Sequence, residues 1–165
     1  MRFPKSARIH HRSLQEGLFR LGSSIYSPIL KMVWRPLDTG ELRHGFRDQV
    51  PALIGPVQVL VSVPKKRRKR AVDRVLLRRR LREAWRASVG PLMLKVEAID
   101  EIRTLSVALI YQEKRNADYG EIKENTEKLV SKLILKLEKK YISKATDSND
   151  NVSEESAGES PDVSD

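Results

Sequence analysis

The sequence contains no cysteine and no long apolar run. Without cysteine the chain cannot form disulfide bonds, cysteine–zinc sites or thiol nucleophiles, and we expect a cytoplasmic protein. No stretch approaches the roughly 18 consecutive apolar residues that a transmembrane helix needs. The basic segment 1–12 lacks the apolar core of a secretory signal. We therefore predict neither a membrane span nor a secretory signal.

Catalytic motifs are missing as well. The sequence has no HExxH, no GxSxG, no Walker-type GxxxxGK[ST] and no carboxylate cluster of the calcium-loop kind. The three histidines are His10, His11 and His44, and we expect the adjacent pair to lie in a solvated basic loop. We predict no catalytic residue and no metal site in the protein itself.

Positive charge is abundant and unevenly placed. The formal net charge of +10 is the difference between a body, residues 1–142, of +16 and a C-terminal segment, residues 143–165, of −6. Within the body, the window 65–86 holds 12 lysine and arginine residues against two acids, Asp73 and Glu83. This window therefore carries as much net charge as the whole chain.

The C-terminal segment 143–165 is rich in serine and asparagine and has seven acids against one base, Lys144. Such a composition predicts a disordered acidic tail. The tail could be a solubilising linker. Alternatively, it could fold back over the basic window and compete with non-specific RNA.

Apolar periodicity predicts one α+β domain over residues 1–142. The expected helices cover 13–21, 71–88 and a stretch capped by Asp118, and the expected strands cover 25–26, 29–34, 57–63 and 105–111. Ser13 and Glu16 fit a capping box for the first helix, and Arg35-Pro36 should end the second strand. Residues 37–55 suggest a long loop or a ragged hairpin.

We therefore predict a single sheet of about four strands with helices packed against one face, in the order helix, strands, helix, strand, helix. The strand–helix–strand unit around the basic helix could place strands 57–63 and 105–111 parallel.

The helix 71–88 is two-faced. Leu77, Leu81, Ala84 and Ser88 fall on one side at 100° per residue, with Asp73 and Trp85 at its margins. The opposite side gathers Arg78, Arg79, Arg82 and Arg86, with Val75 among them.

The basic window has three interpretations: a solvated charged face, a membrane-surface helix, or a nucleic-acid contact. Twelve bases with two acids would repel one another on a merely solvated face. A membrane helix would need more apolar surface than this one can spare from the sheet. Arginines on one helical face suit phosphates. Because the helix offers few groups for base edges, we favour structured RNA over DNA.

The window also resembles a known family. The matching residues are Ser62-Val63-Pro64-Lys65-Lys66, Ala71-Val72-Asp73-Arg74, Arg78-Arg79 and Leu81-Arg82-Glu83-Ala84-Trp85. They are similar to the signature of the bacterial ribonuclease P protein subunit, and the opening Phe3-Pro4-Lys5-Ser6-Ala7-Arg8 is similar to that family's start.

The resemblance implies a small α+β subunit with a left-handed strand–helix–strand crossover. It implies the protein subunit of a ribonucleoprotein endoribonuclease, in which a catalytic RNA partner performs the cleavage and binds most of the magnesium. The protein would bind that RNA and the 5′ leader of precursor tRNA, with no organic cofactor and no membrane.

The resemblance and the charge together give our candidate residues. The RNA-binding candidates are Lys65, Lys66, Arg67, Arg68, Arg70, Arg74, Arg78, Arg79, Arg82 and Arg86. The leader-binding candidates, in a cleft between the sheet and the first helix, are the aromatic residues Phe19, Tyr26 and Trp34. The alternative for each of them is ordinary core packing. Trp85 should pack inside.

One departure from the family pattern stands out. Arg74-Val75-Leu76 replaces the family's Arg-Asn-Arg, and Val75 falls in the middle of the basic face.

The alternative functions are a non-catalytic RNA-binding protein of the ribosomal type with a similar fold, and after it a DNA-binding protein.

Overall fold

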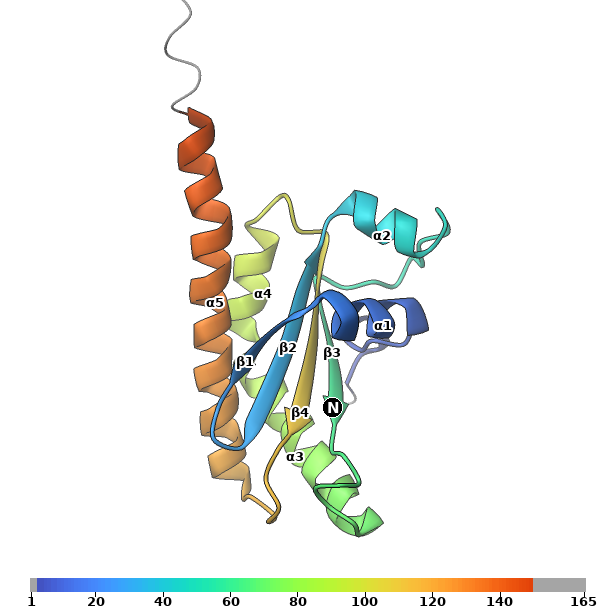
Figure 1. The fold of residues 1–165 in the computed structure, drawn as a ribbon, viewed down its shortest axis with the longest axis vertical. Helices are drawn as coiled ribbons and strands as arrows, with labels where there is room; N and C mark the ends of the chain where they lie inside the picture. Colours follow the sequence, from blue (N-terminus) through green and yellow to red (C-terminus); the bar gives the residue numbers. More distant parts are fainter. Residues whose placement is uncertain (1–2, 150–165) are drawn as a thin grey trace, which may run out of the picture. The chain divides into compact units, whose positions relative to one another are not determined.

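The computed structural model describes residues 3–149 (Figure 1). In chain order its elements are η1 (Lys5–Ala7), α1 (Arg12–Leu21), β1 (Ser23–Tyr26), β2 (Leu30–Leu37), α2 (Thr39–Gly45), β3 (Val57–Ser62), α3 (Ala71–Ser88), α4 (Gly90–Glu97), β4 (Thr104–Tyr111) and α5 (Tyr119–Asn149). No helix in this described range is long and apolar enough to span a bilayer.

The four strands form one mixed sheet in the order β1-β2-β4-β3. β1 pairs antiparallel with β2, and β2 antiparallel with β4. β3 and β4 are parallel, with Val57 opposite Leu105, as the sequence predicted. The α+β class and the single four-stranded sheet are confirmed, and the left-handed sense of the β3–β4 connection stays a prediction.

Helices cover both faces of the sheet, so the expectation of one covered face was wrong. Ala108 of β4 packs in a cluster with Leu14 and Leu18 of α1, while α3, α4 and the first half of α5 lie on the other side (Figure 1). The reason is visible in β4, where every residue except Ile110 is buried. A strand without polar alternation is covered on both faces.

The main elements begin and end close to their predicted positions. α3 covers residues 71–88 as predicted, and the Glu121 N–H donates to Asp118 Oδ1 at 2.9 Å at the start of α5. α1 starts at Arg12, so Ser13 lies inside the helix and the predicted capping box is absent. Glu16 pairs instead with Arg12 at 2.6 Å.

Two short helices and one strand extension were not predicted. Asp38 and Glu41 form a capping box for α2, within the segment predicted as loop. α4 begins immediately after α3, with Pro91 in its first turn. β2 runs through Pro36 to Leu37, because β1 pairs only with residues 31–34 and no ladder hydrogen bond is lost on that side of Pro36.

The chain divides into two compact units, the first ending at Ile134. Of the second unit, residues 135–149 are described and continue α5 to Asn149. The helix thus extends past residue 142, into the segment for which we predicted disorder. The rest of the segment 143–165 lies outside the described residues, and the domain boundary stays a prediction.

Candidate nucleic-acid interface

The N-terminal segment lies along the open edge of β3. The Ile9 N–H donates to Val59 O at 3.2 Å, and the Gln58 side-chain amide donates to Ser6 O at 3.3 Å. These contacts shield a strand edge that would otherwise be open to pairing. They also bring Arg8 beside α3, where it lines one hollow with Arg79 and Arg82.

The loop between β3 and α3 is held by its own arginines. Arg74 Nη1 donates to two main-chain carbonyl oxygens, Arg68 O at 2.9 Å and Lys69 O at 2.6 Å. Arg68 in turn forms an ion pair of 2.6 Å with Asp73 in the first turn of α3. The loop is therefore fixed to the helix that follows it.

The same loop and helix are tied to the β4–α5 connection. Asn116 Nδ2 donates to Asp73 Oδ1 at 3.0 Å, and Arg67 Nη2 donates to Gln112 Oε1 at 3.3 Å. Hydrogen bonds from Asn116 and Arg68 hold the pKa of Asp73 below its usual value. Its carboxylate is therefore charged and engaged at neutral pH.

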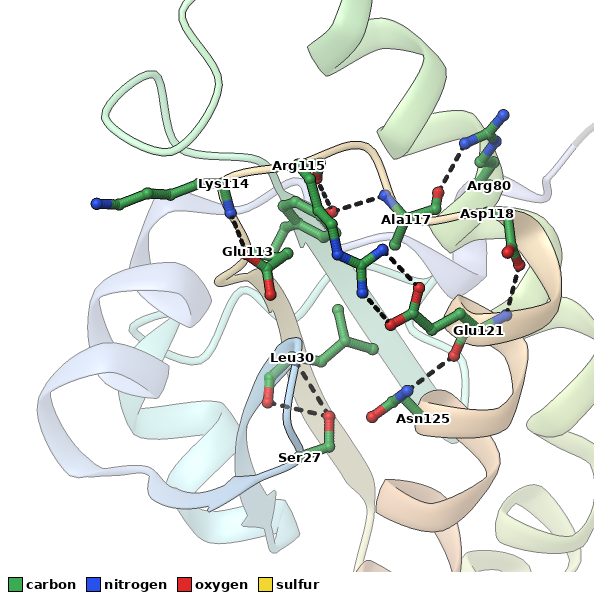
Figure 2. Close-up of polar contacts among 11 residues, drawn as sticks. Ser27, Leu30, Arg80, Glu113, Lys114, Arg115, Ala117, Asp118, Glu121 and Asn125 are labelled. Carbon is green, nitrogen blue, oxygen red and sulfur yellow. Dashed lines mark hydrogen bonds and ion pairs between the residues drawn. The ribbon is translucent and has the colours of Figure 1, made fainter.

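Figure 2 shows how the β4–α5 connection is braced. Arg80 Nη1 donates to Ala117 O at 2.6 Å, and the buried hydroxyl of Tyr111 accepts from the Ala117 N–H at 3.0 Å. Arg115 donates to both carboxylate oxygens of Glu121 and lowers the pKa of that group. Burial raises the pKa of Tyr111. The connection is thus a firm support for the loop and α3.

The ten RNA-binding candidates divide into two groups. Four have partners in the chain: Arg67, Arg68 and Arg74 as above, and Arg86, which pairs with Glu83 at 3.1 Å and lies 5.8 Å from the Phe3 ring centroid. The side chains of the other six form no hydrogen bond or ion pair with residues 3–149; they are Lys65, Lys66, Arg70, Arg78, Arg79 and Arg82. Of these six, only Arg78 is half-buried.

Seven of these ten bases line two hollows. One, of about 490 Å³, is lined by Lys66, Arg67, Arg68, Lys69, Arg70, Asp73 and Lys114. The other, of about 270 Å³, is lined by Phe3, Arg8, Arg79, Arg82, Glu83 and Arg86. We call Lys65, Lys66, Lys69 and Arg70 the loop cluster, and Arg8, Arg79 and Arg82 the groove cluster.

Three of these bases were not among the candidates. Lys69 lies within the basic run itself. Arg8 and Lys114 are far from the run in the sequence, and they reach the hollows because of the β3-edge contact and the β4–α5 connection. Only Arg8 had a sequence signal, since it ends the N-terminal motif that resembles the family.

The basic face of α3 is interrupted. Val72 is 78% exposed, Val75 58% and Leu76 38%. We call these three residues the apolar strip. Along the chain they lie between Arg70, the last residue of the loop cluster, and Arg79 of the groove cluster. The sequence suggested one arginine face with a single foreign residue. In the structure three exposed apolar residues lie between Arg70 and Arg79, where the arginines Arg74 and Arg78 are half-buried.

The three aromatic candidates do not form one surface. Trp34 is only 5% exposed, so its assignment to leader stacking is wrong. Its neighbour Val33 packs against α1, so Trp34 faces the opposite side of the sheet. Phe19 and Tyr26 are 51% and 59% exposed, and the Lys31 Nζ lies 5.6 Å from the Tyr26 ring centroid.

The remaining predictions for this region concern Trp85 and metals. Trp85 is 2% exposed and packs inside, as predicted. Within residues 3–149, no group of three or more histidine, aspartate or glutamate side chains is placed to hold a metal ion.

Comparisons with known proteins identify a family and similar folds. The model of the family "Ribonuclease P" matches residues 3–134. The fold is similar to the RNase P protein of Staphylococcus aureus, with a TM-score of 0.51 and 16% identity over 83% of this chain and 99% of that one. It is also similar to the RNase P protein of Thermotoga maritima, with a TM-score of 0.51 and 17% identity over 76% and 96% of the two chains. A search of curated protein sequences found no match.

Proposed function

Because the chain belongs to the ribonuclease P protein family, we propose that it is the protein subunit of a ribonuclease P. In this proposal it binds the catalytic RNA through the loop and groove clusters. It also binds the 5′ leader of precursor tRNA, and so promotes endonucleolytic 5′ maturation of tRNA in the cytoplasm.

The observation that carries the proposal is the set of bases without partners. Lys65, Lys66, Arg70, Arg79 and Arg82 are exposed and unpaired within the described residues. Like charges gathered on one loop and one helix repel one another, so the free protein is less stable than the same protein with these charges neutralised by a ligand. A polyanion that places phosphates on these bases removes the repulsion and releases counterions. Structured RNA supplies phosphates at a density that a small acidic ligand lacks.

Our proposal places the leader strand on the α1 side of the sheet. Tyr26 is opposite Lys31 in the β1–β2 ladder and shares its face with Val33, which packs beneath α1. An exposed aromatic ring with a lysine beside it can stack on an unpaired base and contact its phosphate. Phe19 of α1 is an exposed ring on the same side of the sheet.

Hydrolysis itself is assigned to the RNA partner. In our proposal magnesium is bound mainly by that RNA, and the described residues have no carboxylate or imidazole cluster that would hold the ion. The chain contributes positive charge and strand positioning. These raise the affinity of the complex for its substrate.

The RNA that copurifies with the protein tests this proposal. The tagged protein is isolated from its native cells at moderate salt, and the bound RNA is sequenced. We expect enrichment of one structured RNA of the ribonuclease P type and of precursor tRNAs. Enrichment of ribosomal RNA alone would favour a ribosomal-type binder, and enrichment of DNA a DNA-binding protein.

A further inference from the structure

The apolar strip lies on the same side of α3 as the arginines of the groove cluster. At 100° per residue, Val72, Val75, Arg79 and Arg82 fall within a sector of about 80°. The strip also separates the two clusters, since Arg70 and Arg79 are nine residues apart, or about 13 Å along the helix axis. A ligand that spans both clusters along α3 must pass over the strip.

Val72 and Val75, the two most exposed residues of the strip, contribute little to the packing of the described chain. Val72 and Val75 are 78% and 58% exposed, whereas the core side of the same helix is formed by residues such as Leu77 and Leu81, both 0% exposed. Helix propensity does not require valine here either, because serine and asparagine have similar propensities. The exposed apolar groups are thus available to a ligand.

We propose that the apolar strip contacts an unpaired nucleotide of the catalytic RNA, whose flanking phosphates bind the loop cluster and the groove cluster. The inference rests on the proposed function and adds a point of base contact to it. The strip has no side-chain hydrogen-bond donor or acceptor, so it contacts the face of a base or a ribose by apolar packing. In a duplex the base faces are stacked inside, so the nucleotide at the strip is unpaired.

Charge favours RNA over a second copy of this chain as the occupant. The clusters on both sides of the strip are cationic, and six of their bases have exposed side chains without a hydrogen bond or ion pair within residues 3–149: Lys65, Lys66, Lys69, Arg70, Arg79 and Arg82. A second copy of this chain would bring a like-charged face to them. An RNA strand supplies phosphates at both ends of the strip and an apolar base surface between them.

The test compares a strip variant with a charge variant. In Val72→Ser/Val75→Ser the apolar contact is removed at equal charge, and in Arg79→Gln/Arg82→Gln two phosphate contacts are removed. Affinity for the catalytic RNA of ribonuclease P is measured over a series of salt concentrations. We expect the strip variant to bind about three- to tenfold more weakly with an unchanged salt slope, and the charge variant to have a shallower slope.

Leu94→Ser is the matched control, because Leu94 is 70% exposed on the neighbouring helix α4. It should bind the RNA as the parent does, and thermal melting should show all three variants folded. If the charge variant loses affinity but the strip variant does not, the strip inference is overturned and the proposed function stands. If the charge variant keeps the parent's affinity and slope, the proposed binding face itself is wrong.

A photo-cross-linker at position 75 gives a second readout. Val75→p-benzoylphenylalanine should cross-link to one or a few unpaired nucleotides of the catalytic RNA. Cross-linking only to paired regions, or only to a second copy of the protein, would overturn the inference.

Discussion

Arg68 and Asp73 form an ion pair of 2.6 Å that joins the β3–α3 loop to the first turn of α3. Asp73 is one of two acids in the window 65–86, and the other, Glu83, pairs with Arg86 at 3.1 Å. Both acids are therefore engaged by arginines that help to hold the structure. Within residues 3–149, the exposed bases of the loop and groove clusters form no ion pair, so they are available to RNA phosphates.

Removing the two groove-cluster arginines of α3 should weaken RNA binding and its salt dependence. For Arg79→Gln/Arg82→Gln we expect a loss of about 1–3 kcal/mol in total at moderate salt and a salt slope reduced by about 1–2. Neither arginine has a partner in the described chain, so stability should change little. Filter binding at several salt concentrations measures both quantities.

Arg103→Gln is the control for that experiment. Arg103 is exposed just before β4. It lines neither the hollow of the loop cluster nor that of the groove cluster. A loss of affinity in Arg103→Gln as large as in the double variant would contradict a localised interface.

Asp73 should contribute stability that depends on pH. Its folded pKa is lowered, so its contribution is complete above the usual aspartate pKa and is lost as pH falls through the lowered value. Asp73→Asn should melt at a lower temperature than the parent at pH 7, and the difference should shrink as the pH falls below about 4. Melting curves from pH 7 to pH 2 test this. The pKa of Glu121 is also lowered, but Glu121 is present in both the parent and the variant. The difference between their melting temperatures therefore reports on Asp73.

A difference that stayed constant down to pH 2 would mean that the Asp73 carboxylate is not the group that titrates. Asp118→Asn is a useful comparison, because Asp118 caps α5 outside the Arg68 network.

Arg74 is expected to act on RNA indirectly, by shaping the loop cluster. In Arg74→Lys the positive charge remains, but one ammonium group cannot reproduce the guanidinium contacts to Arg68 O and Lys69 O. We expect affinity for the catalytic RNA to fall by about 1 kcal/mol with no change in salt slope. The matched control is Arg70→Lys, an exposed arginine of the same loop without such contacts, which should bind nearly as the parent does. Equal behaviour of the two variants would contradict the loop-shaping role.

The exposed and buried aromatic residues should respond differently to substitution. Tyr26→Ala should reduce affinity for precursor tRNA by about 1–3 kcal/mol and leave mature tRNA, which lacks the leader, unaffected. Trp34→Ala should instead lower the free energy of unfolding by about 3–5 kcal/mol, because Trp34 is buried. Equilibrium binding and urea unfolding separate the two effects. Tyr26→Ala would count against a leader site at β1 if it weakened binding of both tRNAs equally.

Strong periodic patterns allowed the core of the fold to be predicted. α3 matches its predicted range because leucines at helical spacing mark one buried side between Arg70 and Gly90. Helix α2 was not predicted, because Gly40 and Gly45 favour a loop. Its start is nevertheless stabilised by the capping box of Asp38 and Glu41. The two covered faces were not predicted, although a continuous apolar run such as that of β4 indicates a strand buried on both sides.

The site was predicted in composition but not in arrangement. The identity of Arg74 does not reveal whether its guanidinium points to solvent or to its own loop, because that depends on where Arg68 O and Lys69 O lie. Likewise, Arg8 joins Arg82 only through the pairing of the N-terminal segment with β3. Such contacts between distant residues are set by tertiary structure and leave no local pattern in the sequence.

Cleavage of precursor tRNA by the catalytic RNA, with and without this protein, tests the central claim most directly. The substrates carry 5′ leaders of decreasing length, and the cleavage rate is measured at limiting magnesium. The account predicts that the protein increases the rate and that the gain shrinks as the leader is shortened. No gain at any leader length, with the RNA active by itself, would contradict the assignment as a ribonuclease P subunit.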